Sequence, residues 1–458
     1  MNRKSSHFDQ FWIRIFSAAF LLIFILFAGC SGETIIDTVF PTGSDSNTTE
    51  TEELSTLPAT DAVASAGDIA TVQPTPEETQ EFTVDQNELV VWIPEEFSIL
   101  VDSEAATILK QRIEDFERQN PGTVIIVRVK ASSGSGGILN SLRNTKIAAS
   151  NALPQIVLLS RADMEDAVEQ ELLTPVEEFF HDNNPAAYFS YAYEISELGG
   201  IMYGFPFVGD ALVGIATEDI PGAGFTTWDE IRTKKIPLYF AANSPQATLF
   251  ISQYLSTNGM LVDEQGHATF ADENLMAVLD SFDQNVRSRI FQENFSTLNT
   301  SKDVWNLLQN GDAKWEINWY SKALQSDLSG LYIFQIPSLG PEPYVSASGW
   351  VWTIVDTDTE VSEIVPEFIA FFSDPQFLAA YSQAAGYLPI LPDSLALYEN
   401  DDQISSVLTA AHALPENDLI LELGPIFRDA TLMVLNQDYT LEEITEITQK
   451  QIEALQTK

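Results

Sequence analysis

The sequence predicts an α/β protein built from two lobes, and three observations support this prediction. Apolar runs of strand length alternate with amphipathic helical segments between Glu88 and Phe180, which is typical of a parallel sheet covered on both faces. A second series of helices and strands begins after about residue 217. Roughly 370 residues follow the N-terminal leader and tether, enough for two domains of ordinary size.

The first series supports the prediction element by element. In chain order, the predicted elements are strand 88–94, helix 103–119 ended by "NPG", strand 123–129, helix 138–150, strand 155–160 and helix 162–173. Right-handed crossovers make such strands parallel, and ligands bind beyond their carboxyl ends. The first candidate ligand contacts are therefore residues 92–96, 131–137 and 160–163.

The second series begins with "FTTWDEIRTKK", a predicted helix that carries a capping box from Thr227 to Glu230. The elements predicted after it are strand 236–243, helices near 245–258, 272–288 and 301–310, a strand running into a helix over 313–328, strand 345–355, and helices up to the C-terminus. No internal repeat is evident.

The chain's only cysteine stands at the end of its longest apolar run. Three basic residues precede fourteen uncharged ones, Ile15 to Ala28, which is short for a spanning helix and typical of a signal peptide. The segment resembles a bacterial lipoprotein signal, although Phe27 replaces the usual aliphatic residue. This resemblance implies a signal peptide over 1–29 and lipid attachment at Cys30. An uncleaved single-helix anchor is the alternative, and both place the rest of the chain outside the cytoplasmic membrane.

Residues 30–86 predict a disordered acidic tether. From Ser31 to Gln86 the chain has twelve acids and no Lys or Arg, so it cannot bury enough apolar surface to offset its ordering entropy. The acidity continues beyond it, because 54 acids face 19 Lys and Arg after residue 86, within a total net charge of −45. Such a charge argues against nucleic acid or an anionic lipid surface as a partner.

Several catalytic and metal-binding classes are excluded by missing motifs. The four histidines stand apart, and HExxH, paired cysteines, GxxxxGK[ST] and GxSxG are all absent from the sequence. Acids at 356–367 have the spacing of a calcium loop, but Val361 occupies the position that needs glycine. We therefore expect no metal, no cofactor and no catalytic residues.

The order of these segments resembles the extracellular solute-binding proteins of ABC importers, family 1, which includes maltose-binding-protein-like sugar-binding lipoproteins. The matching stretches span nearly all of residues 88–390 and are "FERQNPGTVIIVRV", "ASNALPQIVLLSRADMEDAVEQELLTPVEEF", "MYGFPFVGDALVGIAT", "TWDEI", the "NW" after "GDAKWEI", and "SGWVWTIV" through "AFFSDPQFLAAYSQAAGYLPI". Departures from the pattern are Gln155 for Asp, Ala216 for Asn and Glu171 for Gly. The first two are expected to alter the ligand cleft.

The resemblance implies a two-lobe periplasmic-binding-protein-like fold of type II. Each lobe would be a mainly parallel sheet flanked by helices, with the ligand cleft between the lobes. The N-terminal lobe would comprise 87–208 plus 344–388, and the C-terminal lobe 209–343 plus 389–458. The chain would cross near 208–212, 341–346 and 388–392, and ligand contacts to both lobes would drive closure.

This resemblance also implies the function and the partners. It predicts a monomer, lipid-anchored at the extracytoplasmic face of a bacterial membrane. The monomer would bind a small polar molecule, most simply a mono- or oligosaccharide, and deliver it to ABC transporter permease subunits. One alternative is a sensory receptor that presents its ligand to a membrane kinase. A second is an extracellular carbohydrate-active enzyme that uses two carboxylates.

Nine residues are candidate ligand contacts. Strand position alone suggests Trp92, Glu95, Asn243 and Trp350. The resemblance adds Arg161 and Asp163 as polar contacts, Asp210 as a sugar-binding carboxylate, and Trp319 with Tyr320 as stacking aromatics. Core packing is the alternative role for Trp92 and Trp350, and a helix start is the alternative for Arg161 and Asp163.

Overall fold

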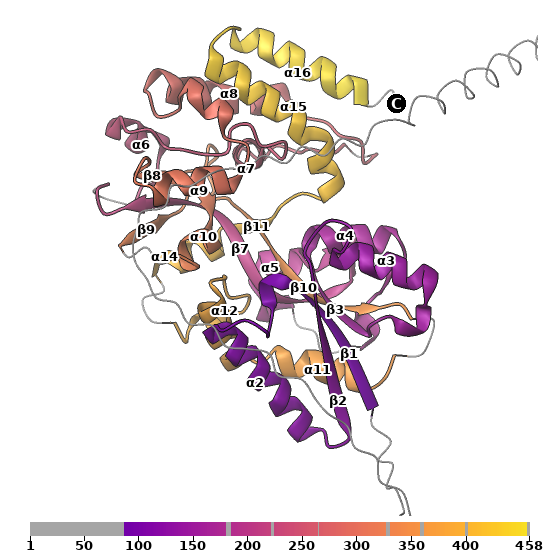
Figure 1. Cartoon of the computed structure of the whole chain (residues 1–458). Coiled ribbons are helices and arrows are strands. Elements are labelled where there is room, and N and C mark those ends of the chain that lie inside the picture. Colours follow the sequence, from indigo (N-terminus) through magenta and orange to yellow (C-terminus); the bar gives the residue numbers. More distant parts are fainter. Residues whose placement is uncertain are drawn as a thin grey trace, which may run out of the picture. The chain divides into compact units, whose positions relative to one another are not determined.

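One mixed sheet runs through the protein in a computed structural model (Figure 1). The structure describes residues 87–179, 185–220, 224–263, 265–326, 330–357, 361–398 and 402–455. The predicted leader, Cys30 and tether lie outside these residues. The order of the main strands is β2-β1-β3-β10-β7-β8, with β4 and β11 on β10 and β9 on β7.

The first part of the sheet is parallel, as its alternation with helices predicts. Strand β1 (Asn87–Pro94) pairs with β2 (Thr123–Lys130) and with β3 (Ile156–Ser160) in parallel register. Helices α2 (Glu104–Gln119) and α3 (Ile138–Ala148) form the crossovers between these strands. Because crossovers cover both faces of such a sheet, β3 is buried along its length.

Two long strands carry the chain through the middle of the sheet. Strand β7 (Gly204–Thr217) pairs antiparallel with β10 (Val345–Val355) through its first half, from Gly204 to Ala211. Its second half, from Leu212 to Thr217, pairs with β8 (Trp315–Trp319) and β9 (Leu331–Phe334). One continuous strand therefore links the two halves of the sheet.

Two glycines allow close packing at this junction. Gly209 on β7 and Gly349 on β10 are register partners. A Cβ at Gly349 would lie 2.5 Å from the Val208 carbonyl oxygen on β7, and a Cβ at Gly209 would lie 2.2 Å from the Tyr191 hydroxyl. Both distances are shorter than any van der Waals contact, so a larger residue at 349 would push β10 from β7, and one at 209 would displace the Tyr191 ring.

The second half of the sheet departs from the sequence prediction at one strand. Residues 236–243 were expected to form a strand, but they make only the isolated parallel bridge between Tyr239 and Glu316. Pro237 has no N–H to donate, and Ala242 donates to the Phe240 carbonyl in a tight turn. Strand β7 enters this half from the first half of the sheet, and its partners here, β8 and β9, are both antiparallel to it.

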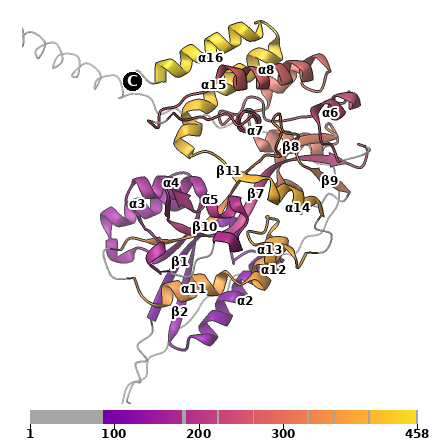
Figure 2. The same cartoon turned by 180° about the vertical axis from the view of Figure 1, so that it is seen from behind.

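Helices cover both halves (Figures 1 and 2), and side chains cap the starts of some of them, among them α2, α4, α6, α9 and α12. The predicted capping box is present, since Thr227 and Glu230 close the start of α6. The remaining α-helices are α4 (Arg161–Glu169), α5 (Ser190–Glu194), α6 (Trp228–Lys234), α7 (Thr248–Ser256), α8 (Asp272–Arg287), α9 (Ser301–Gln309), α10 (Tyr320–Leu324), α11 (Ile364–Phe372), α12 (Pro375–Ala385), α13 (Pro392–Leu395), α14 (Asp402–Thr409), α15 (Asn417–Asn436) and α16 (Leu441–Leu455). Short strands are β4 (Leu173–Thr174), β5 (Glu197–Leu198), β6 (Ile201–Met202) and β11 (Ala411–Ala413).

Two hydrophobic cores lie against this sheet, and β7 contacts both. Leu212 and Ala216 belong to the second core, whereas Val213 and Ile215 on the other face belong to the first. Helices α8, α15 and α16, which lie together in Figure 2, supply the second core. Buried residues from Ile390 to Ala411 belong to the first core. The lobe boundaries from the sequence stay a prediction.

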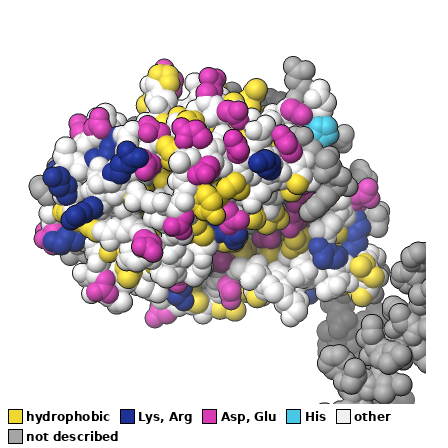
Figure 3. Space-filling model, turned by 90° about the horizontal axis from the view of Figure 1, so that it is seen from above, with side chains coloured by type: hydrophobic (Ala, Val, Ile, Leu, Met, Phe, Trp, Pro, Cys, Tyr) yellow, Lys and Arg dark blue, Asp and Glu magenta, His cyan; other side chains and the backbone are white. Residues whose placement is uncertain are grey.

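The described surface reflects the acidic composition. Asp and Glu side chains are spread over the face seen from above rather than gathered into one patch (Figure 3). Among the described residues, no helix has both the length and the apolar character that a membrane span requires.

We predict that Glu316→Gln stabilises the protein at alkaline pH. Glu316 on β8 is fully buried and accepts one hydrogen bond, 2.8 Å from Asn318 Nδ2. Burial raises its pKa to about 7, so the folded state loses stability from this group as pH rises from about 4.5 to about 7. Glutamine does not titrate, and the variant should gain up to ~3 kcal/mol relative to the parent between pH 5 and pH 8.

Urea unfolding of both proteins at the two pH values measures this difference. Glu273→Gln on the exposed start of α8 is the matched control and should show no such change. An unchanged difference in unfolding free energy between pH 5 and pH 8 for Glu316→Gln would contradict a raised pKa.

Candidate functional site

Three adjoining hollows meet at one side chain, Trp319. Their cavity volumes are about 200, 500 and 330 Å³, and Trp319 lines all three. Gln246 and Thr248 line both the first and the second hollow, Ser348 lines the first and the third, and Lys322 lines the second and the third. We call this group of hollows, which share these lining residues, the Trp319 cleft.

The register of β7 sets the position of Trp319. This residue ends β8 opposite Leu212 on β7, and its backbone N–H donates to Asn318 Oδ1 at 2.9 Å. It is also the N-cap of α10. The side chain is half-buried, so part of the indole faces the cleft while the rest is held by the fold. Such a surface is suited to stacking against a flat ligand face.

Aromatic side chains continue the cleft wall at its third hollow. The Trp350 and Tyr387 ring centroids lie 4.8 Å apart, and Phe97 packs edge-on against Trp350 at 5.4 Å. Trp350 and Tyr387 both line this hollow. Burial raises the pKa of Tyr387 well above its usual range, so its hydroxyl stays a hydrogen-bond donor at physiological pH. Tyr387 lies in the stretch ending "GYLPI" that carries the family resemblance, but it was not among the candidate ligand contacts.

Asp210 lies at the floor of the third hollow and is tied to its surroundings. Its Oδ1 accepts from the backbone N–H groups of Ala211 at 2.9 Å and Ser321 at 3.0 Å, and its Oδ2 accepts from Ser321 Oγ at 2.5 Å. Burial raises the pKa of Asp210 to about 6 despite these bonds. The carboxylate therefore links the crossing strand to α10, and it has little free capacity for a ligand.

Arg161 and Glu165 form an ion pair in the wall of the first hollow. Arg161 Nε lies 2.6 Å from Glu165 Oε1, and the guanidinium also donates to the Glu194 carbonyl. Glu165 Oε2 accepts from the Asn417 backbone N–H at 2.6 Å. Burial is the main cause that raises the pKa of Glu165, opposed by Arg161. The charges of Arg161 and Glu165 therefore compensate each other in this wall.

The other predicted contacts fall outside the three hollows or at their margins. Asp163 binds Ser160 at the start of α4, where the two side chains lie 2.9 Å apart, so the helix-start role is the one observed. Asn243 Nδ2 donates to Asn299 Oδ1 at 2.8 Å, and only Asn299 lines the cleft. Glu95 and Glu96 are both exposed, and only Glu96 lines the third hollow. The predicted contact range 92–96 includes Glu96, although Glu95 was the residue chosen from it.

Two predicted stacking residues are corrected by their burial. Trp92 is 2 % exposed and Tyr320 is 3 % exposed, and both pack in the first core. Lys130 Nζ lies 4.1 Å from the Trp92 ring centroid. In a strand covered on both faces, alternation does not show which face meets a ligand. The sequence signal was therefore ambiguous for Trp92, and core packing is the role that the structure gives both residues.

The departures from the expected pattern do not reshape the cleft. Gln155 Oε1 accepts from the Val90 backbone N–H at 2.8 Å, and Ala216 is fully buried; neither lines a hollow of the Trp319 cleft. Glu171 adopts a φ of 55°, a conformation that favours glycine. This explains why glycine would suit that position.

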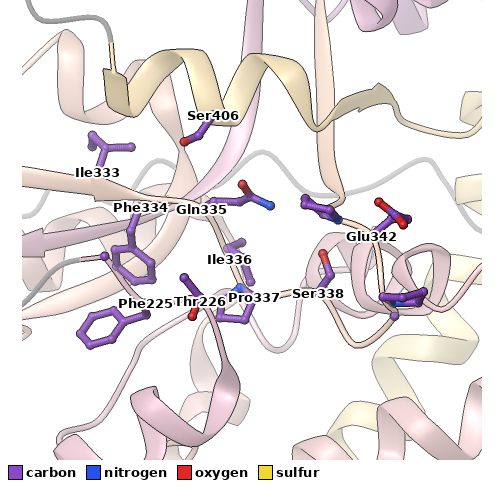
Figure 4. Close-up of a pocket in the computed structure, with 14 residues that line it drawn as sticks. Phe225, Thr226, Ile333, Phe334, Gln335, Ile336, Pro337, Ser338, Glu342 and Ser406 are labelled. Atoms are coloured by element: carbon purple, nitrogen blue, oxygen red, sulfur yellow. The ribbon is translucent and has the colours of Figure 1, made fainter.

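A further hollow of about 430 Å³ lies elsewhere, beside β9 (Figure 4). Phe225 and Phe334 form one wall at a centroid distance of 5.3 Å, and Ser406 on α14 faces them. It shares no lining residue with the Trp319 cleft. Glu342 is its only charged lining residue among those described.

Comparison with known proteins defines the class to which this fold and cleft belong. Residues 111–411 match the family described as bacterial extracellular solute-binding protein. This match covers well over half of the sequence, and the chain belongs to that family. The expected relationship to importer solute-binding proteins is confirmed, and the family consists of binding proteins rather than enzymes. Comparison with curated protein sequences finds no significant match.

Solved structures share the whole two-lobe fold. The sugar-binding protein MalE from Xanthomonas citri is 16 % identical with a TM-score of 0.65, over 81 % of this chain and 98 % of that one. A cyclic alpha-maltosyl-1,6-maltose binding protein from Arthrobacter globiformis is 15 % identical with a TM-score of 0.66, over 81 % and 98 %. Maltose-bound MalE3 from T. maritima is 16 % identical with a TM-score of 0.59, over 80 % and 99 %. The predicted α/β two-lobe fold is confirmed.

We predict that Ser321→Ala destabilises the protein more at pH 8 than at pH 5. The change removes the hydroxyl that donates to Asp210 Oδ2, which costs about 1–3 kcal/mol when a buried charge loses its donor. The pKa of Asp210 should then rise further above about 6, and protonation at pH 5 removes most of the penalty.

Chemical denaturation at both pH values measures this effect. Ser373→Ala removes a hydroxyl that donates to the Ile369 carbonyl at 2.9 Å rather than to a carboxylate, and it serves as the control. Equal losses at pH 5 and pH 8 would mean that the hydroxyl does not stabilise an ionised Asp210.

Proposed function

We propose that this protein captures a mono- or oligosaccharide in the Trp319 cleft. The observation that carries the proposal is the exposed part of Trp319 at the meeting point of all three hollows. Sugars have apolar C–H faces that stack on aromatic rings and hydroxyls that need paired donors and acceptors. Ser348, Glu96 and Gln246 supply such polar groups around the rings.

The mechanism follows from the way the cleft is built. Strands β7 and β10 run beneath it, and both halves of the sheet contribute lining residues. A ligand that contacts both halves stabilises the closed arrangement by its difference in affinity for the two states. Each neutral hydrogen bond contributes about 1 kcal/mol net, so several contacts are needed for micromolar affinity.

The proposal extends to where the protein acts and what receives its ligand. The apolar leader and the lone Cys30 support lipid attachment at the extracytoplasmic face of the membrane, with residues 30–86 as the tether. Membership of the extracellular family supports this location. Delivery of the ligand to ABC transporter permease subunits by a monomer completes the proposed role. Similar structures are described as bound to maltose or maltotetraose, which supports sugar as the ligand class.

We predict that Trp319→Ala abolishes sugar binding and leaves the melting temperature within a few degrees of the parent. The half-buried ring contributes ligand contact, while the core beneath it stays packed. Titration of the soluble chain against a panel of neutral and acidic mono- and oligosaccharides, followed by intrinsic fluorescence and calorimetry, measures binding. Chromatography of the mixture afterwards should show intact sugar.

Two variants make this test specific. Trp319→Phe keeps an aromatic face and should retain part of the affinity, while Tyr439→Ala removes an aromatic ring that is 49 % exposed outside the cleft and should change nothing. Failure of every sugar to bind the parent would overturn the proposed function. Loss of folding in Trp319→Ala would instead identify Trp319 as a core residue.

A further inference from the structure

We propose that the ligand of the Trp319 cleft is an acidic sugar, one that carries a carboxylate or phosphate group. This inference rests on the proposed function and narrows its ligand class. It arises from the second hollow, the largest part of the cleft at about 500 Å³. Lys302 and Lys322 both line this hollow, and its described lining contains no Asp or Glu.

This absence of acids stands out against the composition of the protein. The chain has three times as many acids as basic residues, so a cavity lined by two lysines and no carboxylate reverses the local sign of charge. The described ion pairs include neither lysine. Lys322 is already half-buried. Closure of the cleft would desolvate it further, which is costly unless the ligand brings a negative charge.

The nearest carboxylates are engaged elsewhere. Asp303 accepts from the backbone N–H groups of Asn299 and Thr300 in the capping box of α9. Asp210 interacts electrostatically with Lys322, but its oxygens are held by Ser321 and Ala211. Neither acid lines the hollow. Both lysines therefore keep positive charge available on the cleft side.

Backbone dipoles add to this field. Helices α7 and α9 both begin in the wall of the second hollow, through Thr248 and Ser301. The start of α7 has no side-chain cap, so its first N–H groups are free to donate to a bound group. Helix N-termini favour anions, and the start of α7 supports the same sign as the two lysines, whereas the start of α9 already holds the Asp303 carboxylate.

The third hollow, which shares Lys322 with the second, adds carboxylates to the cleft. Glu96 and Asp210 line the third hollow beside Trp350 and Tyr387. A sugar with an acid group at one end and hydroxyls at the other would fit this gradient in one orientation, with the acid group at Lys302 and Lys322. Trp319 would then stack on the ring between the two ends.

Calorimetric titration of the soluble chain with matched sugars tests the inference. Digalacturonate should bind at least about tenfold more tightly than neutral galactobiose at low salt, because an added charge-assisted contact is worth about that factor. Glucose 6-phosphate and glucose form the phosphate arm, and a preference there in place of digalacturonate would identify phosphate as the acid group. Higher salt should reduce the preference for the acidic sugar.

Lysine variants then locate the acid group. Lys322→Gln and Lys302→Gln should each weaken the acidic sugar by about tenfold and change the neutral one by less than about threefold, while Lys322→Arg restores the preference. Lys314→Gln, which removes an equal charge paired with Asp219 outside the cleft, should leave both affinities unchanged. Circular dichroism confirms that each variant folds.

The outcomes separate this inference from the proposed function. Tight binding of neutral sugars with no preference for their acidic counterparts would overturn the acidic ligand and leave sugar capture intact. Equal weakening of both sugars by Lys322→Gln would overturn it as well, because the lysine would then serve sugar hydroxyls. Absence of binding to any sugar would overturn the proposed function itself.

Discussion

The pairing of β7 with β10 at the junction of two hydrophobic cores is the constraint on which the cleft depends. Gly349 allows the strands to approach, Gly209 leaves room for the Tyr191 ring, and the following register places Ser348 opposite Asp210. Two residues further along β7, Leu212 pairs with Trp319. A short run of register partners therefore positions both walls of the cleft. A one-residue slip would turn each of these side chains to the other face.

The Asp210 carboxylate lies beside Gly209 on β7, and removing its charge from water lowers the stability of the folded state. Asp210 is 6 % exposed, and three donors stabilise it, one from its own strand and two from α10. Two of those donors belong to Ser321 at the start of α10, directly after Trp319. The bond from strand to helix thus fixes the helix start that positions the indole. Because its oxygens already accept these three hydrogen bonds, Asp210 supports the structure of the cleft rather than serving as its main ligand contact.

The sequence predicts most elements of this fold because their signals are local. The alternation of β1, α2 and β2 and the capping box of α6 depend on periodicity and on neighbours three residues apart. The prediction of a strand over 236–243 was wrong, because the pairing of this segment depends on residues far along the chain. Trp319 lines the cleft, whereas Trp92 is buried, since a strand covered on both faces gives no pattern that separates core from cleft. Lys322 lies outside the stretches that carry the resemblance and Tyr387 lies inside one, but in both cases only the tertiary structure shows that the residue reaches the site.

Net charge and site charge are separate properties in this protein. The excess of acids is spread over the described surface (Figure 3), where it keeps the chain solvated and is screened by salt within about 10 Å. Inside the cleft, low polarisability and exclusion of water make nearby groups dominate. A ligand approaching the second hollow therefore meets Lys302 and Lys322 at short range, even though the molecule as a whole repels anions. This repulsion lowers the rate of encounter with an acidic sugar more than it lowers the affinity of the bound state, because the bound contacts lie well within the screening length.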